Sequence, residues 1–218
     1  MRNTRSNHSL VALLVATGIA MAGLATDARA DGASKALMHN WWDPLTVVGQ
    51  TELHRSDDGL KANVKLNADF IDPDRAFTLW FIVFNTPEGC LSSPCTVADV
   101  FNPSANADFL YGGGIITPRN KAEFGGSLAV HDDTGSGFLE FDPPGPALGL
   151  TDPWNAEVML AIHSHGPAGS GALLAWQISS FLGGCAEFLG PDGFAAGPED
   201  IPDEAGECST IMYAIHQP

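Results

Sequence analysis

The stretch "LKANVKLNADF" (residues 60–70) alternates apolar and polar side chains over its whole length. Leucine, alanine, valine and phenylalanine take the even positions, while lysine, asparagine and aspartate take the odd ones. Successive side chains of a β-strand point to opposite faces, so this period of two predicts a strand with one face on a core and one face in water.

The sequence that follows predicts a second strand of a different kind. The turn-forming residues "IDPDR" (71–75) lead into "AFTLWFIVFN" (76–85), a continuous run of β-branched and aromatic side chains. Such a run is typical of a strand buried on both faces in the middle of a sheet. We expect it to pair with residues 60–70 as a hairpin.

Further strands are expected along the rest of the chain, at 46–53, 109–117, 123–131, 137–141, 156–165 and 209–217. Glycines inside 109–117 and 123–131 indicate bulges or close backbone packing. Residues 170–184 fit either a short helix or a strand. Strand after strand with Gly/Pro turns predicts an all-β sandwich or barrel with at most one short helix.

The N-terminal thirty residues have the pattern of a signal peptide. Arg2 and Arg5 precede the apolar run "LVALLVATGIAMAGLA" (10–25), and Ala28 and Ala30 frame a small-residue cleavage site. We expect residues 1–30 to be removed, 31–45 to form a lead-in segment, and 46–218 to form one domain. The predicted location is periplasmic or extracellular, with no stable membrane insertion after cleavage.

The charge of the chain limits its partners. Lys and Arg number 10 against 26 Asp and Glu, giving a formal net charge of −16. Such a surface repels nucleic acid, so no nucleic-acid partner is expected. The partner is instead predicted to be an extracellular ligand or protein of unspecified kind.

The four cysteines form an even set in a chain expected to be exported, which predicts disulfides. Three pairings are possible, and we favour Cys90–Cys95 with Cys185–Cys208. The second pair would close a polar, acidic, Gly/Pro-rich loop of about twenty residues, worth roughly 3 kcal/mol in the chain-entropy treatment. A metal–thiolate site is the alternative, but the chain has no C-x-x-C pair and an oxidising compartment disfavours it.

Two histidines end the predicted strand "AEVMLAIHSH" (156–165). Alternation places His163 and His165 on one face, about 7 Å apart along the strand. Two imidazoles so placed can chelate one copper or zinc ion, with a third ligand from a neighbouring strand. His131, at the end of another predicted strand, is the candidate. The alternative is that both histidines cap a strand end and hydrogen-bond the turn that follows.

Two other groups of residues are candidate binding sites. Asp69, Asp72 and Asp74 offer hard oxygen ligands that suit Ca²⁺, as does the acidic stretch 199–207, although neither has EF-hand spacing. Solvated acidic loops are the alternative interpretation. Trp41 and Trp42 either cover the core or form an exposed aromatic patch that could bind a ligand.

The stretch "AIHSHGPAGSGALL" (161–174) resembles the H-x-H-G-x-A-G-x-x-G-P-V signature of the chordin-type (CHRD) domain. The matching residues are His163, His165, Gly166, Ala168 and Gly169. The sequence departs from the signature where Ser170 and Gly171 lead into "ALL". The resemblance implies a secreted, immunoglobulin-like or superoxide-dismutase-like Greek-key β module that has a binding or structural role and no transferable reaction. The stretch "FNTPEGC" (84–90) is also similar to uncharacterised secreted bacterial proteins.

Taken together, these patterns predict a secreted, disulfide-stabilised β module that binds a ligand or serves a structural role. The sequence has no G-x-S-x-G elbow, and its single D-T-G-S (133–136) lacks the second aspartate motif that an aspartic protease needs. The different-class alternatives are a copper- or zinc-binding protein or metalloenzyme centred on His163 and His165, and a carbohydrate-active β protein.

Overall fold

The structure is a computed structural model that describes residues 32–71, 73–117, 123–132, 148–185 and 208–218. Its strands are β1 (Ala33–Asn40), β2 (Val47–Ser56), β3 (Gly59–Leu66), β4 (Arg75–Phe84), β5 (Ala107–Ile116), β6 (Glu123–Ala129), β7 (Glu157–Pro167) and β8 (Ser209–His216). The α-helix is α1 (Gly171–Gln177), and short 3-10 helices span Ala68–Phe70, Pro87–Gly89, Val97–Phe101 and Pro103–Ala105. The predicted all-β fold with one short helix is confirmed. No helix in the described ranges is long and apolar enough to cross a membrane.

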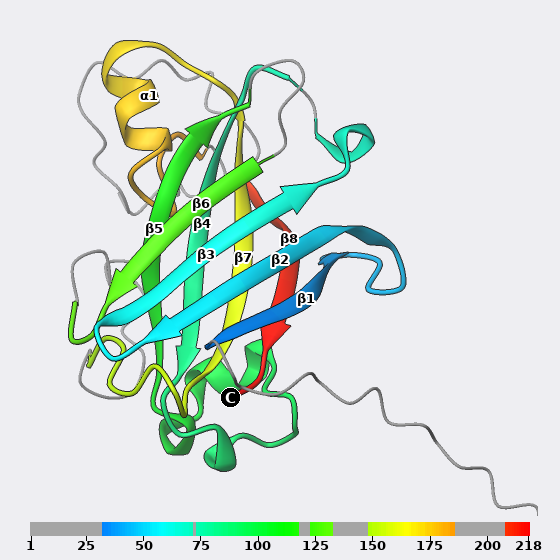
Figure 1. Cartoon of the computed structure of the whole chain (residues 1–218). Coiled ribbons are helices and arrows are strands. Elements are labelled where there is room, and N and C mark those ends of the chain that lie inside the picture. Colours follow the sequence, from blue (N-terminus) through cyan, green and yellow to red (C-terminus); the bar gives the residue numbers. More distant parts are fainter. Residues whose placement is uncertain (1–31, 72, 118–122, 133–147, 186–207) are drawn as a thin grey trace, which may run out of the picture.

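All the strands belong to one antiparallel sheet of eight, in the order β5-β4-β7-β8-β1-β2-β3-β6. In Figure 1, β1, β2, β3 and β6 cross the front diagonally, while β5, β4, β7 and β8 run more steeply behind them. The sheet therefore curls round until its two edges, β5 and β6, are in contact and the shape is nearly a barrel.

Glycine permits the close approach of these edges. A Cβ on Gly126 of β6 would lie 2.6 Å from the carbonyl oxygen of Gly112 on β5. A side chain at Gly126 would hold the edges apart, whereas a Cβ on Gly112 would meet the ring of Phe81 on β4. Glycines inside both strands therefore serve close packing, as expected.

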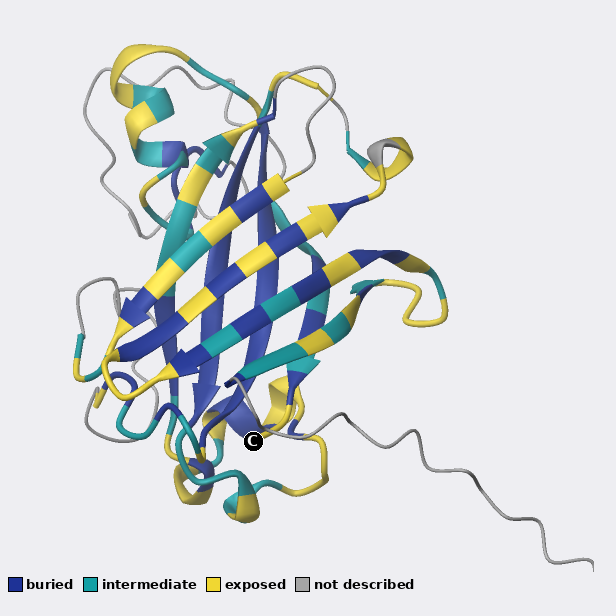
Figure 2. Ribbon diagram, in the orientation of Figure 1, coloured by how far each residue is buried: buried dark blue, intermediate teal, exposed yellow. Residues whose placement is uncertain are grey.

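The front strands are amphipathic, as their period of two predicts. Along β3, buried and exposed residues alternate, and Figure 2 shows the same banding on β2, β3 and β6. Their apolar side chains meet those of the rear strands inside the curl and form the inner core, which includes Leu53, Val64, Phe81 and Leu160. The predicted strand with one dry face and one wet face is therefore confirmed.

The rear strands β4 and β7 are buried on both faces (Figure 2). Their outward side chains, among them Trp80, Ile82 and Met159, form a second cluster that we call the outer core. Residues of the segment between β4 and β5, such as Val100 and Ala105, cover part of it. This double covering explains why the sequence of β4 is continuously apolar.

The predicted hairpin between residues 60–70 and 76–85 is wrong. β3 pairs with β2 and β6, whereas β4 pairs with β5 and β7. The two-residue turn between Ser56 and Gly59 already joins β3 to β2, and a strand that is apolar on both faces needs two buried neighbours. The chain therefore crosses from the front of the curl to the rear after β3.

Two other expectations change in the structure. Residues 33–40, expected within a lead-in segment, form β1 and occupy an inner position of the sheet between β8 and β2. The ambiguous stretch 170–184 begins with α1 and continues without regular strand structure. Four predicted features lie outside the described residues: the signal sequence (1–30), the strand 137–141, Asp72 and the acidic stretch 199–207.

Candidate metal centre

His163 and His165 lie on the outward face of β7. Alternation places Val158, Leu160 and Ile162 in the inner core, and Met159 and Ala161 on the outer face with the two histidines. The two imidazole ring centroids are 5.0 Å apart. The prediction that both rings project from one face is borne out by this geometry.

The segment that follows β7 folds back over both rings. Gln177, at the end of α1, donates hydrogen bonds to the carbonyl oxygens of His165 (3.1 Å) and Pro167 (3.0 Å) and accepts one from the amide of Gly169 (2.8 Å). This anchor brings Phe181 onto His163, with stacked rings whose centroids are 3.9 Å apart. His163 is 2% exposed and His165 is fully buried.

Both predicted disulfides, Cys90–Cys95 and Cys185–Cys208, are present. The second lies against His165, whose Nδ1 is 3.8 Å from Cys185 Sγ and 3.9 Å from Cys208 Sγ. One potential ligand atom from each of His163, His165, Cys185 and Cys208 falls within 4.8 Å of all the others. We call these four residues the outer-face cluster.

Hydrogen bonds fix the tautomer of His165. Nδ1 lies 2.8 Å from the carbonyl oxygen of Gly183, which can only accept, so Nδ1 carries the proton. Nε2 then accepts from the hydroxyl of Thr78 at 2.9 Å, and that hydroxyl accepts from Trp80 Nε1 at 2.7 Å. Burial lowers the pKa of His165 to about 4, so the ring is neutral at pH 7.

The ring nitrogens of His163 make fewer hydrogen bonds than those of His165. Its Nδ1 lies 3.3 Å from the hydroxyl of Thr210, while its Nε2 is buried with no hydrogen-bond partner among the described residues. Burial, with a smaller effect of the neighbouring His165, lowers the pKa of His163 to about 3. A buried polar atom without a partner costs roughly 1–3 kcal/mol, so the fold tolerates a ring nitrogen whose hydrogen-bonding capacity it does not use.

The donor set of the outer-face cluster suits a particular class of ion. Two neutral imidazoles and two cysteine thiolates are the ligands of tetrahedral Zn²⁺ sites, and the same residue types bind copper. In this structure the two sulfurs are bonded to each other, so the two imidazoles are the groups of the cluster that can bind an ion. Cys185 and Cys208 were not predicted to join the histidine pair, because the sequence favoured a disulfide over a metal–thiolate site.

The other predicted ligands are not brought to this cluster. His131 is exposed, follows the end of β6, and does not belong to the cluster of potential ligands around the histidine pair. Asp69 and Asp74 are exposed, and among the described residues they belong to no group of three or more potential metal ligands. The structure thus supplies cysteine, and not His131, beside the histidine pair.

The two tryptophans have different surroundings. Trp41 packs edge-on against Tyr213, with centroids 5.6 Å apart, at the border of the outer core. Trp42 is 75% exposed in the turn between β1 and β2. Of the two predicted roles, covering the core fits Trp41 and an exposed aromatic surface fits Trp42.

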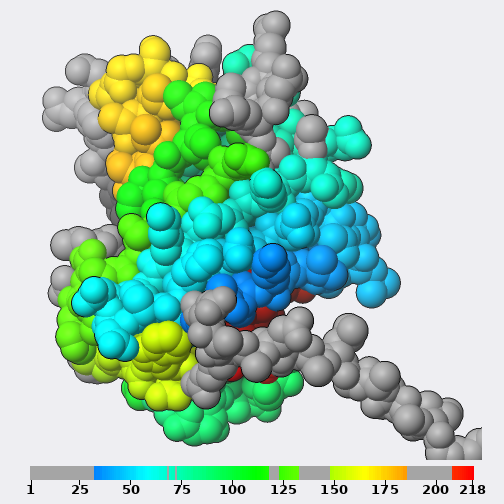
Figure 3. Space-filling model, in the orientation of Figure 1, coloured from blue at the N-terminus to red at the C-terminus, as the bar shows by residue number. Residues whose placement is uncertain are grey.

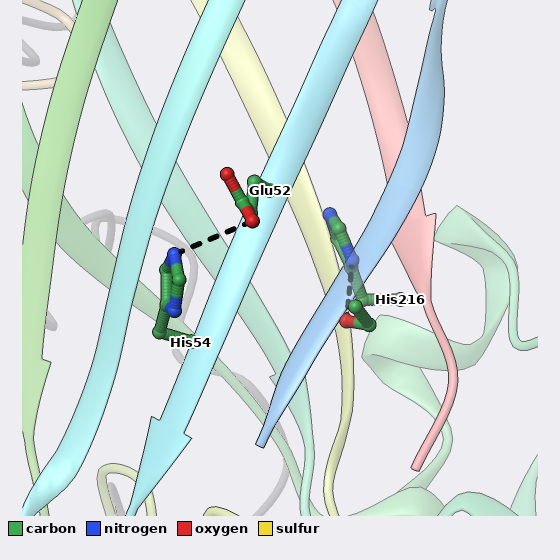
Figure 4. A network of polar contacts seen from close by, with 4 residues as sticks. Glu52, His54 and His216 are labelled. Atoms are coloured by element: carbon green, nitrogen blue, oxygen red, sulfur yellow. Dashed lines mark hydrogen bonds and ion pairs between the residues drawn. The ribbon is translucent and has the colours of Figure 1, made fainter. Parts of the chain in front are cut away.

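A third buried histidine, His216, lies inside the curl. His216 Nδ1 is 2.9 Å from Ser34 Oγ, and its Nε2 is 2.8 Å from Thr51 Oγ1. Figure 4 shows His216 beside β1, apart from the exposed ion pair of Glu52 and His54 on β2. Nδ1 faces the hydroxyl of Ser34 where a Ser–His–Asp triad would have a carboxylate, so this network joins strands and does not match that catalytic arrangement.

A surface groove lies on the face opposite to the outer-face cluster. It has a volume of about 610 Å³ and crosses β1, β2, β3 and β6, whose residues are blue, cyan and green on the face shown in Figure 3. Its lining is largely polar and carries charges of both signs, including Lys35, Glu52, Lys65 and Glu123. None of the four cluster residues lines it.

The comparisons with known proteins assign no relative. No protein-family model matches the chain, and no match was found among curated proteins or solved structures. The geometry of the outer-face cluster is therefore the basis for a functional conclusion.

Proposed function

We propose that this chain is an exported, disulfide-stabilised β module that binds a late first-row transition ion, Zn²⁺ or copper, at the outer-face cluster. One observation carries the proposal: His163 Nε2 is buried without a partner among the described residues, beside three other potential ligand atoms within 4.8 Å. A bound ion would use the lone pair that the protein leaves unpaired.

The surroundings of both rings support this assignment. Metal-binding histidines usually hydrogen-bond through the nitrogen that does not bind the ion. With its proton on Nδ1, toward Thr210, His163 leaves the lone pair of Nε2 for an ion. His165 has Thr78 at Nε2, and its Nδ1, which donates to the Gly183 carbonyl in this structure, also lies 3.8 Å from Cys185 Sγ. For His165 to bind through Nδ1, it must give up the hydrogen bond to Gly183, and its proton must move to Nε2, where the Thr78 hydroxyl oxygen can accept a hydrogen bond from it.

Charge and resemblance agree with a binding role. The formal net charge of −16 favours the approach of cations. The CHRD resemblance implies a secreted module without an established reaction, which supports binding over catalysis.

Metal titration tests the proposal. Protein purified without a histidine tag is titrated with Zn²⁺ against a chromophoric chelator, once in the oxidised form and once after reduction by a dithiol. We expect one ion per chain in at least one form, and loss of that ion in His163→Phe. The matched control is His131→Phe, an exposed histidine outside the cluster, which should bind as the wild type does. Absence of stoichiometric binding in both forms would overturn the proposal.

A second candidate function is carbohydrate binding, favoured by the exposed indole of Trp42. Flat aromatic rings on a surface offer large contact areas with a polar edge. A glycan-array signal that disappears in Trp42→Ala would support it. The control is Trp154→Phe, a second tryptophan whose indole instead hydrogen-bonds Asp57. An array without signal would remove this candidate.

A further inference from the structure

We propose that the Cys185–Cys208 disulfide is the redox switch of the outer-face cluster, and that its reduction by a dithiol completes a His₂Cys₂ metal site. This inference rests on the proposed function and specifies how that function is regulated. The oxidised chain would offer two imidazoles, whereas the reduced chain would offer two imidazoles and two thiolates.

The position of the disulfide supports this role. Both sulfurs lie within 4 Å of His165 Nδ1, at 3.8 and 3.9 Å, although neither cysteine neighbours the histidine in sequence. The other disulfide has different surroundings, because Cys95 donates its amide to the buried carboxylate of Glu157 at 2.5 Å. Among the described residues, only Cys185 and Cys208 share a cluster of potential ligands with histidine.

The two sulfurs also differ in access. Cys185 is 1% exposed, whereas Cys208 is partly exposed at the start of β8. A thiolate of the reductant therefore attacks Cys208 Sγ, the S–S bond breaks, and Cys185 leaves as a thiolate. The second thiol of the reductant then attacks the mixed disulfide and releases Cys208.

The dithiol supplies the two electrons that reduction of the disulfide requires. Its two sulfurs lose two electrons and form a cyclic disulfide, while Cys185 and Cys208 gain one electron each and become thiols once protonated. Binding of a divalent ion then displaces the two thiol protons into solvent, leaving two thiolate ligands. Oxidation by a disulfide of higher potential would reverse the sequence and release the ion.

Other contacts hold both cysteine-bearing segments when the S–S bond is absent. On the side of Cys185, the hydroxyl of Tyr111 donates to the carbonyl oxygen of Ile178, and Gln177 ties α1 to the end of β7. On the side of Cys208, β8 pairs with both β7 and β1. These contacts keep the ligands in place after reduction.

The test uses a chain with one reducible pair. In Cys90→Ser/Cys95→Ser, a dithiol can reduce only Cys185–Cys208, and Zn²⁺ affinity and Co²⁺ absorption are measured before and after reduction. We expect reduction to lower the Zn²⁺ Kd by at least about tenfold. We also expect a thiolate-to-cobalt charge-transfer band in the near ultraviolet, and Zn²⁺ should protect both thiols from alkylation.

The matched control is Cys185→Ser/Cys208→Ser, which keeps Cys90–Cys95 and should show neither the affinity change nor the band. If Cys90→Ser/Cys95→Ser does not fold, fully reduced wild type is compared with this control instead. Equal metal affinity in both redox states, without the band, would overturn the switch and leave the proposed function standing. No metal in either state would overturn both. Loss of the near-ultraviolet circular dichroism of the fold on reduction would overturn the switch alone.

Discussion

His163 shows the conflict between stability and binding at the scale of one residue. Its Nε2 is buried without a partner among the described residues, and its Nδ1 makes one hydrogen bond of 3.3 Å to a partly exposed threonine. Stacking on Phe181 needs only a flat ring. A phenylalanine at this position would keep the stacking and remove the unsatisfied nitrogen.

We therefore expect His163→Phe to raise the free energy of unfolding of the oxidised, metal-free protein by about 1–2 kcal/mol. Denaturant unfolding followed by tryptophan fluorescence measures the change. His165→Phe is the comparison and should lower stability, because Gly183 and Thr78 would each lose a hydrogen-bond partner. A destabilised His163→Phe would show that Nε2 has a stabilising partner in solution.

The lowered pKa of the buried His216 makes the free energy of unfolding depend on pH. Burial, and secondarily the guanidinium of Arg55, lower its pKa to about 4, against 6.5 for the ordinary group. The unfolded chain therefore binds a proton between these values that the folded chain does not, so stability is present above pH 6.5 and is lost as the pH falls toward 4. For His216 alone the loss is roughly 3 kcal/mol.

Unfolding free energies measured between pH 7 and pH 4 check this expectation. His216→Gln should be less stable at pH 7, because two side-chain contacts change, yet its stability should fall less steeply with acid. The slope of the unfolding free energy against pH should be smaller in this variant than in the wild type by up to about 1.4 kcal/mol per pH unit. Parallel curves for the variant and the wild type would contradict the assignment of this proton uptake to His216.

At the scale of elements, the glycines of β6 provide a matched pair of substitutions. A Cβ at Gly126 would lie 2.6 Å from a backbone oxygen of β5, whereas a Cβ at Gly125 would have its nearest neighbour at 3.8 Å. We expect Gly126→Ala to cost about 1–3 kcal/mol by forcing the edges of the curled sheet apart. Gly125→Ala should change stability by less than about 0.5 kcal/mol. Thermal or denaturant unfolding of both variants measures these changes. Equal stabilities of the two variants would show that the edge strands β5 and β6 are not in contact.

Local patterns predicted the elements well, because alternation and apolar runs depend on neighbours in sequence. The period of two identified β3 and the shared face of His163 and His165, and the continuous apolar run identified β4. The pairing of β3 with β4 was wrong, since pairing depends on which strands lie side by side after the sheet has curled. A helix of seven residues was left ambiguous because so short a stretch shows little periodicity.

The candidate site was predicted only in part, for the same reason. The histidine pair is local and was found, whereas Cys185 reaches it only after α1 folds back over β7. Thr78 and Thr210 come from the neighbouring strands β4 and β8, whose register against β7 no local pattern contains. His131 was selected because it ends a strand, but that strand ends at the other end of the sheet (Figure 1).

For the whole molecule, the two disulfides should contribute differently to stability. Cys185 and Cys208 are separated by 23 positions, and Cys90 and Cys95 by 5. In the chain-entropy treatment these loops are worth about 3 and about 2 kcal/mol, respectively. We expect Cys185→Ser/Cys208→Ser to lower the unfolding free energy by about 1 kcal/mol more than Cys90→Ser/Cys95→Ser does. Denaturant unfolding of both double variants measures the difference, and the reverse order would show that local contacts outweigh loop closure.

The place of β8 in the sheet has a consequence for how the chain comes to fold. Residues 209–216 lie between β7 and β1, and thereby join the rear strands to the front ones. A chain that emerges amino end first, from a ribosome or a translocation channel, exposes the facing edges of β1 and β7 until these residues arrive. Unpaired edges readily add strands from other chains. The sheet is thus set to close only after residues 209–216 have emerged, and a chaperone that shields strand edges would act during that interval.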